Sequence, residues 1–491
     1  NTLDHFDSYT EALEFMTKVN AMSTIMDHHA NISIRHACVD GVDLTLEWFS
    51  FQAQQLTEKD FDAARAVDLV YGGNSINMEE FAYDLKDESI ALFPASIRGT
   101  SKLLQVDDTG YVSYHKTFAE SVPSLIKGCH LVLNDSKVLD ARLSVTTVAG
   151  NSTELMLLDL GNICPQSPCK EFTIQAMIRH DCVSKGDVYS IKDSQVEVVE
   201  VRGVWEEDEE SGGNGTDCFV RILSDDSLPT FLDRHGSVPI PPYFHREAEE
   251  SDKERYNTVY AQDAGSVAAP TAGLHFTDDV LKEIGENNMS SLTLHVGAGT
   301  FMPVLSKDAR DHAMHAEHFF CQVGEVRAIV NALEKGKPIC VVGTTSTRTL
   351  ETLFWLGVKR IKGLESKDDE LELKQFEWVP LSVGDGKRTS PISALRALIE
   401  GKSDNTVISG KTSLMITPKA YDFKVVDHLV TNFHAPDSTL MLLVSAFLGR
   451  QTKIGEVYEA AQRRGYKFLS YGDSCLLSRP GVKLPSREKG S

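Results

Sequence analysis

Short blocks rich in Gly, Thr, His and Asn recur through the second half of this chain, and they carry the residue types that could do chemistry. Neither the apolar stripe of a helix nor the alternation of a strand selects such compositions. Histidine and carboxylate side chains are common proton-transfer groups in enzymes. We therefore expect these blocks to line a site. In chain order they are 266–276, 294–301, 312–317, 342–348 and 427–434.

The block 342–348 has the clearest signal for a charged ligand. It follows an apolar run and opens a helix, so free backbone N–H groups meet the hydroxyls of Thr344 and Thr345 beside Arg348. A helix N-terminus of this kind favours an anion. The Gly-Lys-Ser/Thr of a P-loop is missing, which favours a carboxylate or a nucleic-acid phosphate over a nucleoside triphosphate. A Thr-rich helix cap that binds nothing is the alternative.

Two other blocks exclude some chemistries. In 294–301 a strand runs into a loop with two glycines, but no further glycine or acidic residue completes a dinucleotide-binding fingerprint. His312, His315 and Glu317 lack the spacing of a HExxH zinc site and no separate third ligand stands out, so we expect no metal. For each single histidine, a satisfied buried imidazole is the alternative to a catalytic one.

Length and composition bound the class of protein. A chain of 491 residues is longer than one hydrophobic core usually fills, so two or three domains are expected. The share of apolar residues, 41%, excludes a disordered chain, and no run of roughly 18 uncharged apolar residues predicts a membrane span. Nine cysteines without CxxC pairs predict reduced, buried thiols.

The formal net charge of −22 argues against a protein that binds nucleic acid over a large basic surface, because phosphate binding requires Lys and Arg. Any nucleic-acid contact must then be local. A basic C-terminal stretch is one candidate, and a solvated helix face followed by a tail explains it equally well. Its basic residues are Arg450, Lys453, Arg463, Arg464, Lys467, Arg479, Lys483, Arg487 and Lys489.

The order of expected elements predicts a multidomain α/β plus β protein. A small α+β domain comes first, and an α/β main domain with alternating strands and helices follows. Short β-rich runs interrupt the main domain and predict a small all-β, barrel-like insert. The expected limits are 1–74 for the α+β domain, 77–142 and 233–480 for the main domain, 143–232 for the insert, 362–413 for a charged surface insertion and 481–491 for a basic tail.

Together, the blocks resemble the S-adenosylmethionine:tRNA ribosyltransferase-isomerase family of queuosine biosynthesis, in the same order and over residues 77–480. The resemblance extends to stretches between the blocks. These are 81–85, 98–104, 239–243, 256–260, 423–427, 438–440 and 470–473.

The resemblance implies the reaction. The ribosyl part of S-adenosylmethionine is transferred to 7-aminomethyl-7-deazaguanine in tRNA, giving epoxyqueuosine, adenine and methionine, with no further cofactor. A base must remove the C5′ proton that the sulfonium acidifies, an acid helps adenine leave, and the attacking amine must be neutral. Candidates for these proton transfers are His295, His315, Glu317, His434 and Asp473. Expected substrate contacts are Thr271, His275, Gly297, Gly299, Thr344, Thr345, Arg348, Asn432 and Tyr471.

Some positions depart from the family pattern. Asp135 and Asp140 add negative charge to the stretch 134–142, Lys137 and Lys102 stand for arginines, and Asn257 stands for glutamine. Lysine lacks the bidentate geometry of a guanidinium. An enzyme that cleaves S-adenosylmethionine but modifies another acceptor is therefore the alternative function.

Residues 5–72 resemble 4a-hydroxytetrahydrobiopterin dehydratases. His28 and His29 match the paired histidines of that family, and Asp60 matches the acid at a helix start, while Trp48 stands near the third histidine position. This module is either a second active enzyme that binds a pterin or a degenerate dimerisation module that makes the chain a homo-oligomer. A pterin enzyme with an inactive large domain is a further alternative. We expect a cytoplasmic protein, or an organellar one if a targeting segment precedes Asn1.

Overall fold

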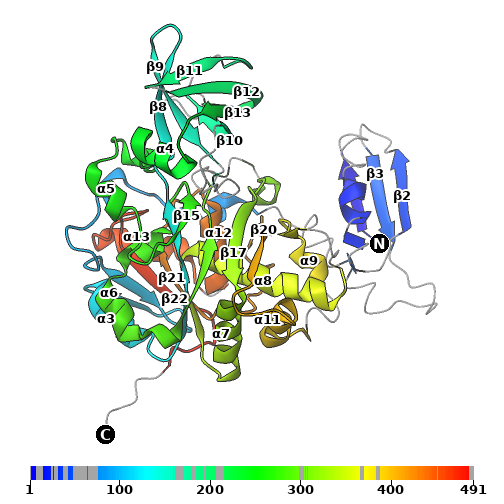
Figure 1. Cartoon of the computed structure of the whole chain (residues 1–491). Coiled ribbons are helices and arrows are strands. Elements are labelled where there is room, and N and C mark those ends of the chain that lie inside the picture. Colours follow the sequence, from blue (N-terminus) through cyan, green and yellow to red (C-terminus); the bar gives the residue numbers. More distant parts are fainter. Residues whose placement is uncertain are drawn as a thin grey trace.

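The structure is a computed structural model. It describes residues 2–6, 15–20, 22, 23, 26, 31–36, 42–47, 63, 64, 76–158, 160, 171–179, 183–192, 194–205, 215–297, 304, 306, 308–364, 370–382, 388–449 and 452–485. Its main parts are a large mixed sheet covered by helices, an inserted barrel and a small N-terminal sheet (Figure 1). This architecture confirms the predicted multidomain fold, with an α/β main domain, a barrel insert and a small leading unit.

A ten-stranded sheet forms the main domain, with the strand order β19-β20-β17-β16-β6-β18-β21-β22-β4-β5. Its four central strands, β16, β6, β18 and β21, are parallel. Almost every side chain of β6, β18 and β21 is buried, as expected for parallel strands covered on both faces. The ten strands are β4 (Leu103–Val106), β5 (Val112–His115), β6 (His130–Asn134), β16 (Met289–Leu294), β17 (Glu317–Gln322), β18 (Ile339–Val342), β19 (Leu371–Leu373), β20 (Val407–Thr412), β21 (His428–Asn432) and β22 (Ser474–Ser478).

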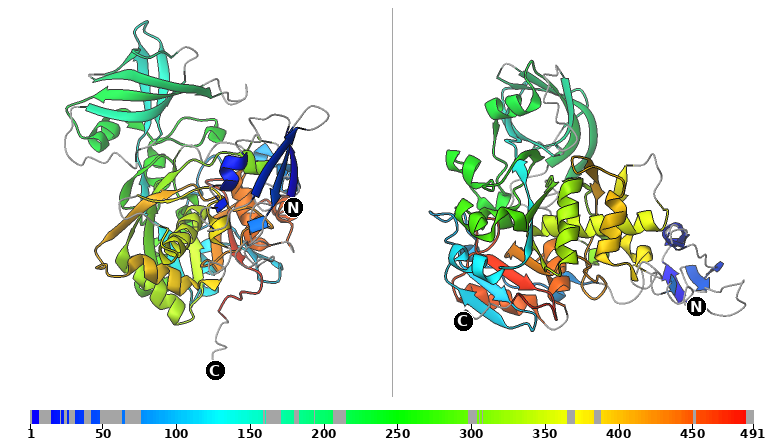
Figure 2. Two further views of the ribbon diagram at one scale, coloured as in Figure 1. Left: turned by 90° about the vertical axis from the view of Figure 1, so that its right-hand side faces the viewer. Right: turned by 60° about the horizontal axis from the view of Figure 1, so that its bottom comes forward.

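Helices lie on both faces of this sheet (Figure 2). The α-helices are α3 (Phe118–Leu125), α4 (Leu228–His235), α5 (Glu250–Arg255), α6 (Asp278–Ile284), α7 (Val323–Glu334), α8 (Gly343–Ile361), α9 (Trp378–Leu381), α11 (Pro391–Ile399), α12 (Thr439–Leu448) and α13 (Ile454–Arg463). The 3₁₀ turns are η1 (Met78–Glu80), η2 (Asp87–Ser89), η3 (Pro242–Phe244), η4 (Thr271–His275), η5 (Glu286–Asn288) and η7 (Ala309–Asp311).

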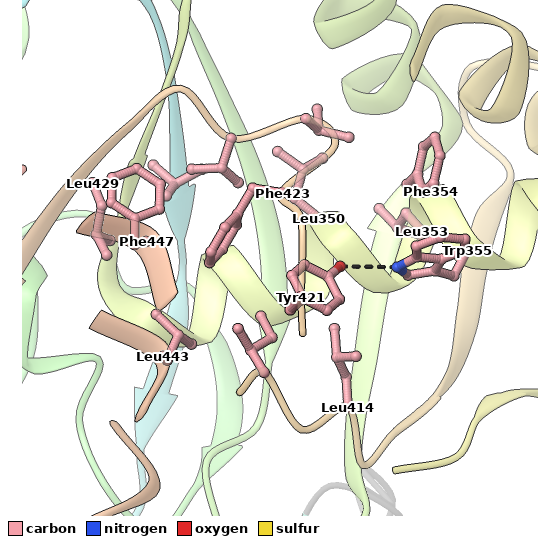
Figure 3. Packing of buried hydrophobic residues seen from close by; sticks show 14 of the residues in the cluster. Leu350, Leu353, Phe354, Trp355, Leu414, Tyr421, Phe423, Leu429, Leu443 and Phe447 are labelled. Carbon is pink, nitrogen blue, oxygen red and sulfur yellow. Dashed lines mark hydrogen bonds between the residues drawn. The ribbon is translucent and has the colours of Figure 1, made fainter. Parts of the chain in front are cut away.

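Helix α8 is almost entirely buried and is fixed by a polar cluster inside the core. The carboxylate of Glu351 accepts a 2.8 Å hydrogen bond from the hydroxyl of Tyr421 and others from the backbone N–H groups of residues 424–426. The indole of Trp355 donates to the same tyrosine oxygen at 2.8 Å (Figure 3). Buried polar groups that are fully paired specify one arrangement, so these bonds set the position of the helix.

The insert is a closed antiparallel barrel. Its six strands are β8 (Arg142–Thr147), β9 (Ser152–Leu157), β10 (Glu171–Ile178), β11 (Val188–Ile191), β12 (Ser194–Trp205) and β13 (Gly215–Leu223). Pairing of β11 with β8 closes the ring, and β14 (Gly236–Ser237) adds to β8 on the way back to the main sheet. Side chains alternate between the apolar interior and the surface, as in other small barrels, and the short β-rich runs of the sequence correspond to these strands.

Residues 362–413 differ from the expected surface insertion. Strand β20 pairs with β17 along its whole length, and Leu395 and Leu398 of α11 are buried in the main core. Charged residues flank these short elements and obscure their pattern, and two of the three buried positions of β20 are Gly410 and Thr412 rather than large apolar residues. Tertiary pairing, which a local pattern does not report, makes this segment part of the sheet.

The described N-terminal residues include an antiparallel sheet in the order β1 (Thr2–Phe6), β3 (Val42–Glu47) and β2 (Asn31–His36). His28, His29 and Asp60 lie outside the described residues, as does Gly299. Within the described part of the chain, no helix is both long and apolar enough to cross a membrane. The cysteines described there are buried free thiols, as expected: Cys129, Cys218, Cys321, Cys340 and Cys475.

Candidate active site

The four parallel strands end side by side, at Asn134, Leu294, Val342 and Asn432, and we call this the site edge. In open α/β sheets, ligands bind outside the carboxyl ends of the strands. Glu317 begins β17 just past the end of β16, since Phe319 pairs with Leu294. Most of the blocks singled out in the sequence therefore converge on the site edge.

The side chain of Asn134 holds the strand ends together. Its Oδ1 accepts from the backbone N–H groups of Leu294 at 3.0 Å and Ser136 at 3.2 Å. Its Nδ2 donates to the carbonyl of Leu294 at 3.0 Å and to the hydroxyl of Thr345 at 3.2 Å. The amide thus joins β6, β16 and the first turn of α8. Sequence reasoning did not assign Asn134 to the site, although a polar residue closing an apolar strand was a usable signal.

A buried ion pair joins two of the predicted residues. Nη1 of Arg348 binds Oε2 of Glu317, and both residues are more than nine-tenths buried. The guanidinium Nε donates to the carbonyl of Leu414 at 3.2 Å, and the backbone N–H of Gly297 reaches the other carboxylate oxygen at 3.4 Å. Nη2 of Arg348 is buried and has no hydrogen-bond partner among the described residues. Glu317 therefore orients a guanidinium that keeps one donor for a ligand.

The start of α8 provides further donors. No side chain of the described residues caps this helix, so the N–H groups of its first turn remain available. The hydroxyls of Ser346 and Thr347 return to the carbonyls of Val342 and Gly343 at 2.7 and 3.0 Å. The other two hydroxyls of this turn belong to Thr344 and Thr345, and each can donate to a ligand. The combination of a helix N-terminus with an adjacent guanidinium suits a carboxylate or a phosphate.

His295 lies at the site edge and is hydrogen-bonded to a chain of two serine hydroxyls. Its Nδ1 lies 2.8 Å from the hydroxyl of Ser136, which lies 2.5 Å from the hydroxyl of Ser266. Ser266 accepts the backbone N–H of Val296 at 2.9 Å. Gly265 packs on the ring, because a Cβ there would stand 2.6 Å from Cε1. The ring is half-buried, and the hydroxyl of Ser136 orients it through Nδ1, as a proton-transfer group requires. The two serines were not predicted as site residues.

His275 and His434 are fully enclosed imidazoles. Nδ1 of His275 lies 2.8 Å from the hydroxyl of Ser101, and Nε2 of His434 lies 2.8 Å from that of Thr431. Burial lowers the pKa of each to about 4, so both rings are neutral at pH 7. The amide of Asn432 donates to the carbonyl of Leu469 at 3.0 Å and so binds the site edge to the loop before β22.

The remaining candidates make other contacts. Asp473 uses both carboxylate oxygens on backbone N–H groups, from Lys102 at 2.6 Å and Lys467 at 2.8 Å, so it positions chain segments. Tyr471 donates to Asp252 at 2.8 Å, and His315 is exposed in the segment before β17. Thr271 begins η4, next to the start of α8.

The departures from the family pattern are mostly internal contacts. The carboxyl of Asp135 is buried and accepts from the hydroxyl of Thr293 at 2.7 Å, and burial raises its pKa to about 6. Asp140 forms a 3.2 Å ion pair with Lys253, so its charge is neutralised. Oδ1 of Asn257 accepts the backbone N–H of Val138 at 2.9 Å. Lys137 is the departure that faces solvent.

Fold and site together define an α/β protein in which the start of α8, beside Arg348, and the histidine held by Ser136 meet at one sheet edge. Residues 78–477 match the family described as Queuosine biosynthesis protein, and the chain belongs to this family. This match confirms the family predicted from the sequence. Residues 4–70 match a second family, Pterin 4 alpha carbinolamine dehydratase, as expected for a fused module.

Individual relatives agree with this assignment. The S-adenosylmethionine:tRNA ribosyltransferase-isomerase of Legionella pneumophila strain Corby is 36% identical over 410 residues, which cover 82% of this chain and 100% of the relative. The enzyme of the same name from Treponema denticola is 34% identical over 405 residues, covering 81% and 99%. A solved structure, the S-adenosylmethionine tRNA ribosyltransferase of Thermotoga maritima, is 27% identical over 81% of this chain and 99% of that one, with a TM-score of 0.38.

Proposed function

We propose that the site edge carries out the reaction of this family on S-adenosylmethionine and tRNA. The enzyme transfers and isomerises the ribosyl group of S-adenosylmethionine onto 7-aminomethyl-7-deazaguanine in tRNA, and it releases adenine and methionine. S-adenosylmethionine is a substrate here, and the chain is a transferase-isomerase. The observation that carries the assignment of the site is the Glu317–Arg348 pair at the start of α8.

We assign the methionine carboxylate of the donor to Arg348 and the first turn of α8. The free Nη2 of Arg348 and the hydroxyls of Thr344 and Thr345 are donors, and the helix N-terminus favours negative charge. Glu317 keeps the guanidinium in place through its ion pair. The backbone N–H of Gly297 approaches the carboxylate of Glu317. This part of the site is therefore built from three separate blocks of the sequence.

We assign proton removal from C5′ to His295. Its imidazole is held by Ser136, and the hydroxyl relay to Ser266 fixes which nitrogen is bonded. His275 and His434, being neutral and enclosed, shape the site and do not supply positive charge. Asp473 acts as a positioning residue, because backbone N–H groups occupy both of its oxygens.

Adenine release tests this proposal. Full-length protein is incubated with S-adenosylmethionine and tRNA that carries 7-aminomethyl-7-deazaguanine, and adenine is quantified with and without the tRNA. We expect release that depends on the tRNA and is lost in His295→Ala. Release of adenine without any transfer to this tRNA would favour another acceptor, consistent with the altered stretch 134–142.

A second activity is proposed for the N-terminal module, because residues 4–70 match the pterin dehydratase family. His28, His29 and Asp60 are its candidate acid and base groups. The test follows dehydration of a 4a-carbinolamine pterin by absorbance, with full-length protein and the His28→Ala/His29→Ala variant. Equal rates for both proteins would contradict the second activity and favour a dimerisation module. The oligomeric state of a chain that lacks residues 1–74 would then test that alternative.

We also propose the domain limits 1–74, 77–142 with 233–480, and 143–232, and a cytoplasmic or organellar location.

A further inference from the structure

A cavity of about 610 Å³ lies between the segment 84–89 and the end of α13 with the residues that follow it. Three cations, Lys86, Arg463 and Lys467, and three carboxylates, Asp84, Glu88 and Glu459, line it. Arg463 pairs with Glu459 at 3.6 Å. The charged groups that line the cavity, Lys467 included, therefore nearly balance, and the excess of positive charge beside it comes from Lys102 and Arg464.

At the rim, three cations donate their hydrogen bonds to carbonyl oxygens. Nζ of Lys102 donates to the carbonyls of Gly465 at 2.7 Å and Arg464 at 3.3 Å, and Nζ of Lys467 donates to the carbonyl of Glu88. The guanidinium of Arg464 lies over the ring of Tyr114, 4.2 Å from its centroid, and donates to the carbonyl of Ala460 at 3.3 Å.

None of Lys102, Arg464 and Lys467 forms an ion pair with a carboxylate within the described part of the chain. In a chain of net charge −22, three such cations together make a local positive field. Arg464 and Lys467 are exposed, and stacking on Tyr114 keeps the guanidinium of Arg464 in a fixed orientation. The rim therefore offers preorganised donors to an anion outside the protein.

The rim is tied to the site edge by short covalent and hydrogen-bonded paths. Asp473 accepts the backbone N–H groups of both Lys102 and Lys467. Ser101, the neighbour of Lys102, contacts His275, and the carbonyl of Ser470 accepts from Asn432 at 3.2 Å. An anion held at the rim would thus have a fixed position relative to the reacting groups.

We propose that Lys102, Arg464 and Lys467 bind backbone phosphates of the tRNA and so place its modified nucleotide at the site edge. This inference rests on the proposed function, because tRNA is the acceptor there. Phosphate contacts fix the position of a nucleic acid without reading its sequence. The carboxylates of the cavity repel a phosphate from its interior, which keeps the contact at the rim.

The test measures tRNA affinity of the full-length protein across a range of salt concentrations. Each phosphate contact contributes about 0.7 to 0.9 to the slope of log affinity against log salt, so Lys102→Ala/Arg464→Ala/Lys467→Ala should reduce the slope by about 2 to 3. Lys282→Ala on α6 is the control for loss of an exposed cation, since the Lys282 side chain is 77% exposed and does not contact the rim cations in the described part of the chain. Affinity for S-adenosylmethionine should be unchanged in all variants.

A triple variant with the slope of the unmodified protein would overturn the inference. If the unmodified protein binds tRNA with a slope that the triple variant lowers, but releases no adenine, the proposed function fails and the phosphate contacts stand. If the unmodified protein does not bind tRNA at all, both fail.

Discussion

Replacing Arg348 with methionine should separate the stability of the site from its binding of the donor. The substitution removes the guanidinium that pairs with the buried carboxylate of Glu317, whereas the long contact from Gly297 stays. Loss of one partner of a buried pair costs about 3 to 5 kcal/mol. Replacing both partners, in Arg348→Met/Glu317→Gln, removes the uncompensated charge and should restore most of that free energy of unfolding.

Binding of S-adenosylmethionine should not recover with stability. A hydrogen bond to a charged group contributes about 1.5 to 3 kcal/mol, so loss of the free Nη2 should weaken binding by about 10- to 150-fold. The double variant should therefore be folded and still bind the donor weakly. Urea unfolding followed by tryptophan fluorescence reports on the main core, where Trp355 and Trp378 are buried, and calorimetry reports on binding. A stable double variant that binds the donor as well as the unmodified protein would refute the assignment of the carboxylate to Arg348.

Three further predictions concern the groups around the site. His295→Ala should lower turnover by about 100- to 10,000-fold, the range for a general base, with little change in donor affinity, whereas the exposed control His245→Asn should have no effect on adenine release. Gly265→Ala should also lower turnover, because its Cβ would stand 2.6 Å from the ring of His295; full activity would contradict the packing of that ring. Asp135→Asn should stabilise the protein at pH 7 but not at pH 4. Burial raises the pKa of the Asp135 carboxyl from 3.8 to about 6. The carboxyl group therefore stabilises the fold below pH 4, and this stabilisation is lost as the pH rises through 6. The loss in the free energy of unfolding amounts to about 3 kcal/mol. Urea unfolding of the variant and the unmodified protein at each pH measures the free energy of unfolding. If the two proteins differed by the same amount at pH 4 and pH 7, the buried charge on Asp135 would be contradicted.

Much of the fold was predictable because its elements follow simple periodic patterns. The short β-rich runs that include β10 and β13 indicated a barrel, and the apolar run of β18 leading into a helix indicated an α/β domain. Segment 362–413 was predicted wrongly, because the burial of β20 depends on its pairing with β17. The order of strands in the sheet is likewise a tertiary property that no local pattern contains.

The site was only partly predictable for the same reason. The blocks around His295 and Arg348 were identified by their composition, but the sequence did not show that Glu317 pairs with Arg348. Asn134 and Ser136 act through contacts with strands more than a hundred residues away, so their roles appear only when the strand ends meet. Asp473 has a residue type suited to proton transfer, yet its oxygens are occupied by the backbone.

The central claim is that this chain moves the ribosyl group of S-adenosylmethionine to a tRNA base. The most direct measurement uses donor labelled with carbon-13 in the ribosyl carbons, a single turnover on tRNA carrying 7-aminomethyl-7-deazaguanine, and mass spectrometry of the digested nucleosides. We predict epoxyqueuosine that carries the full label, formed in the same amount as adenine. Adenine formed without label in any nucleoside of that tRNA would contradict the claim.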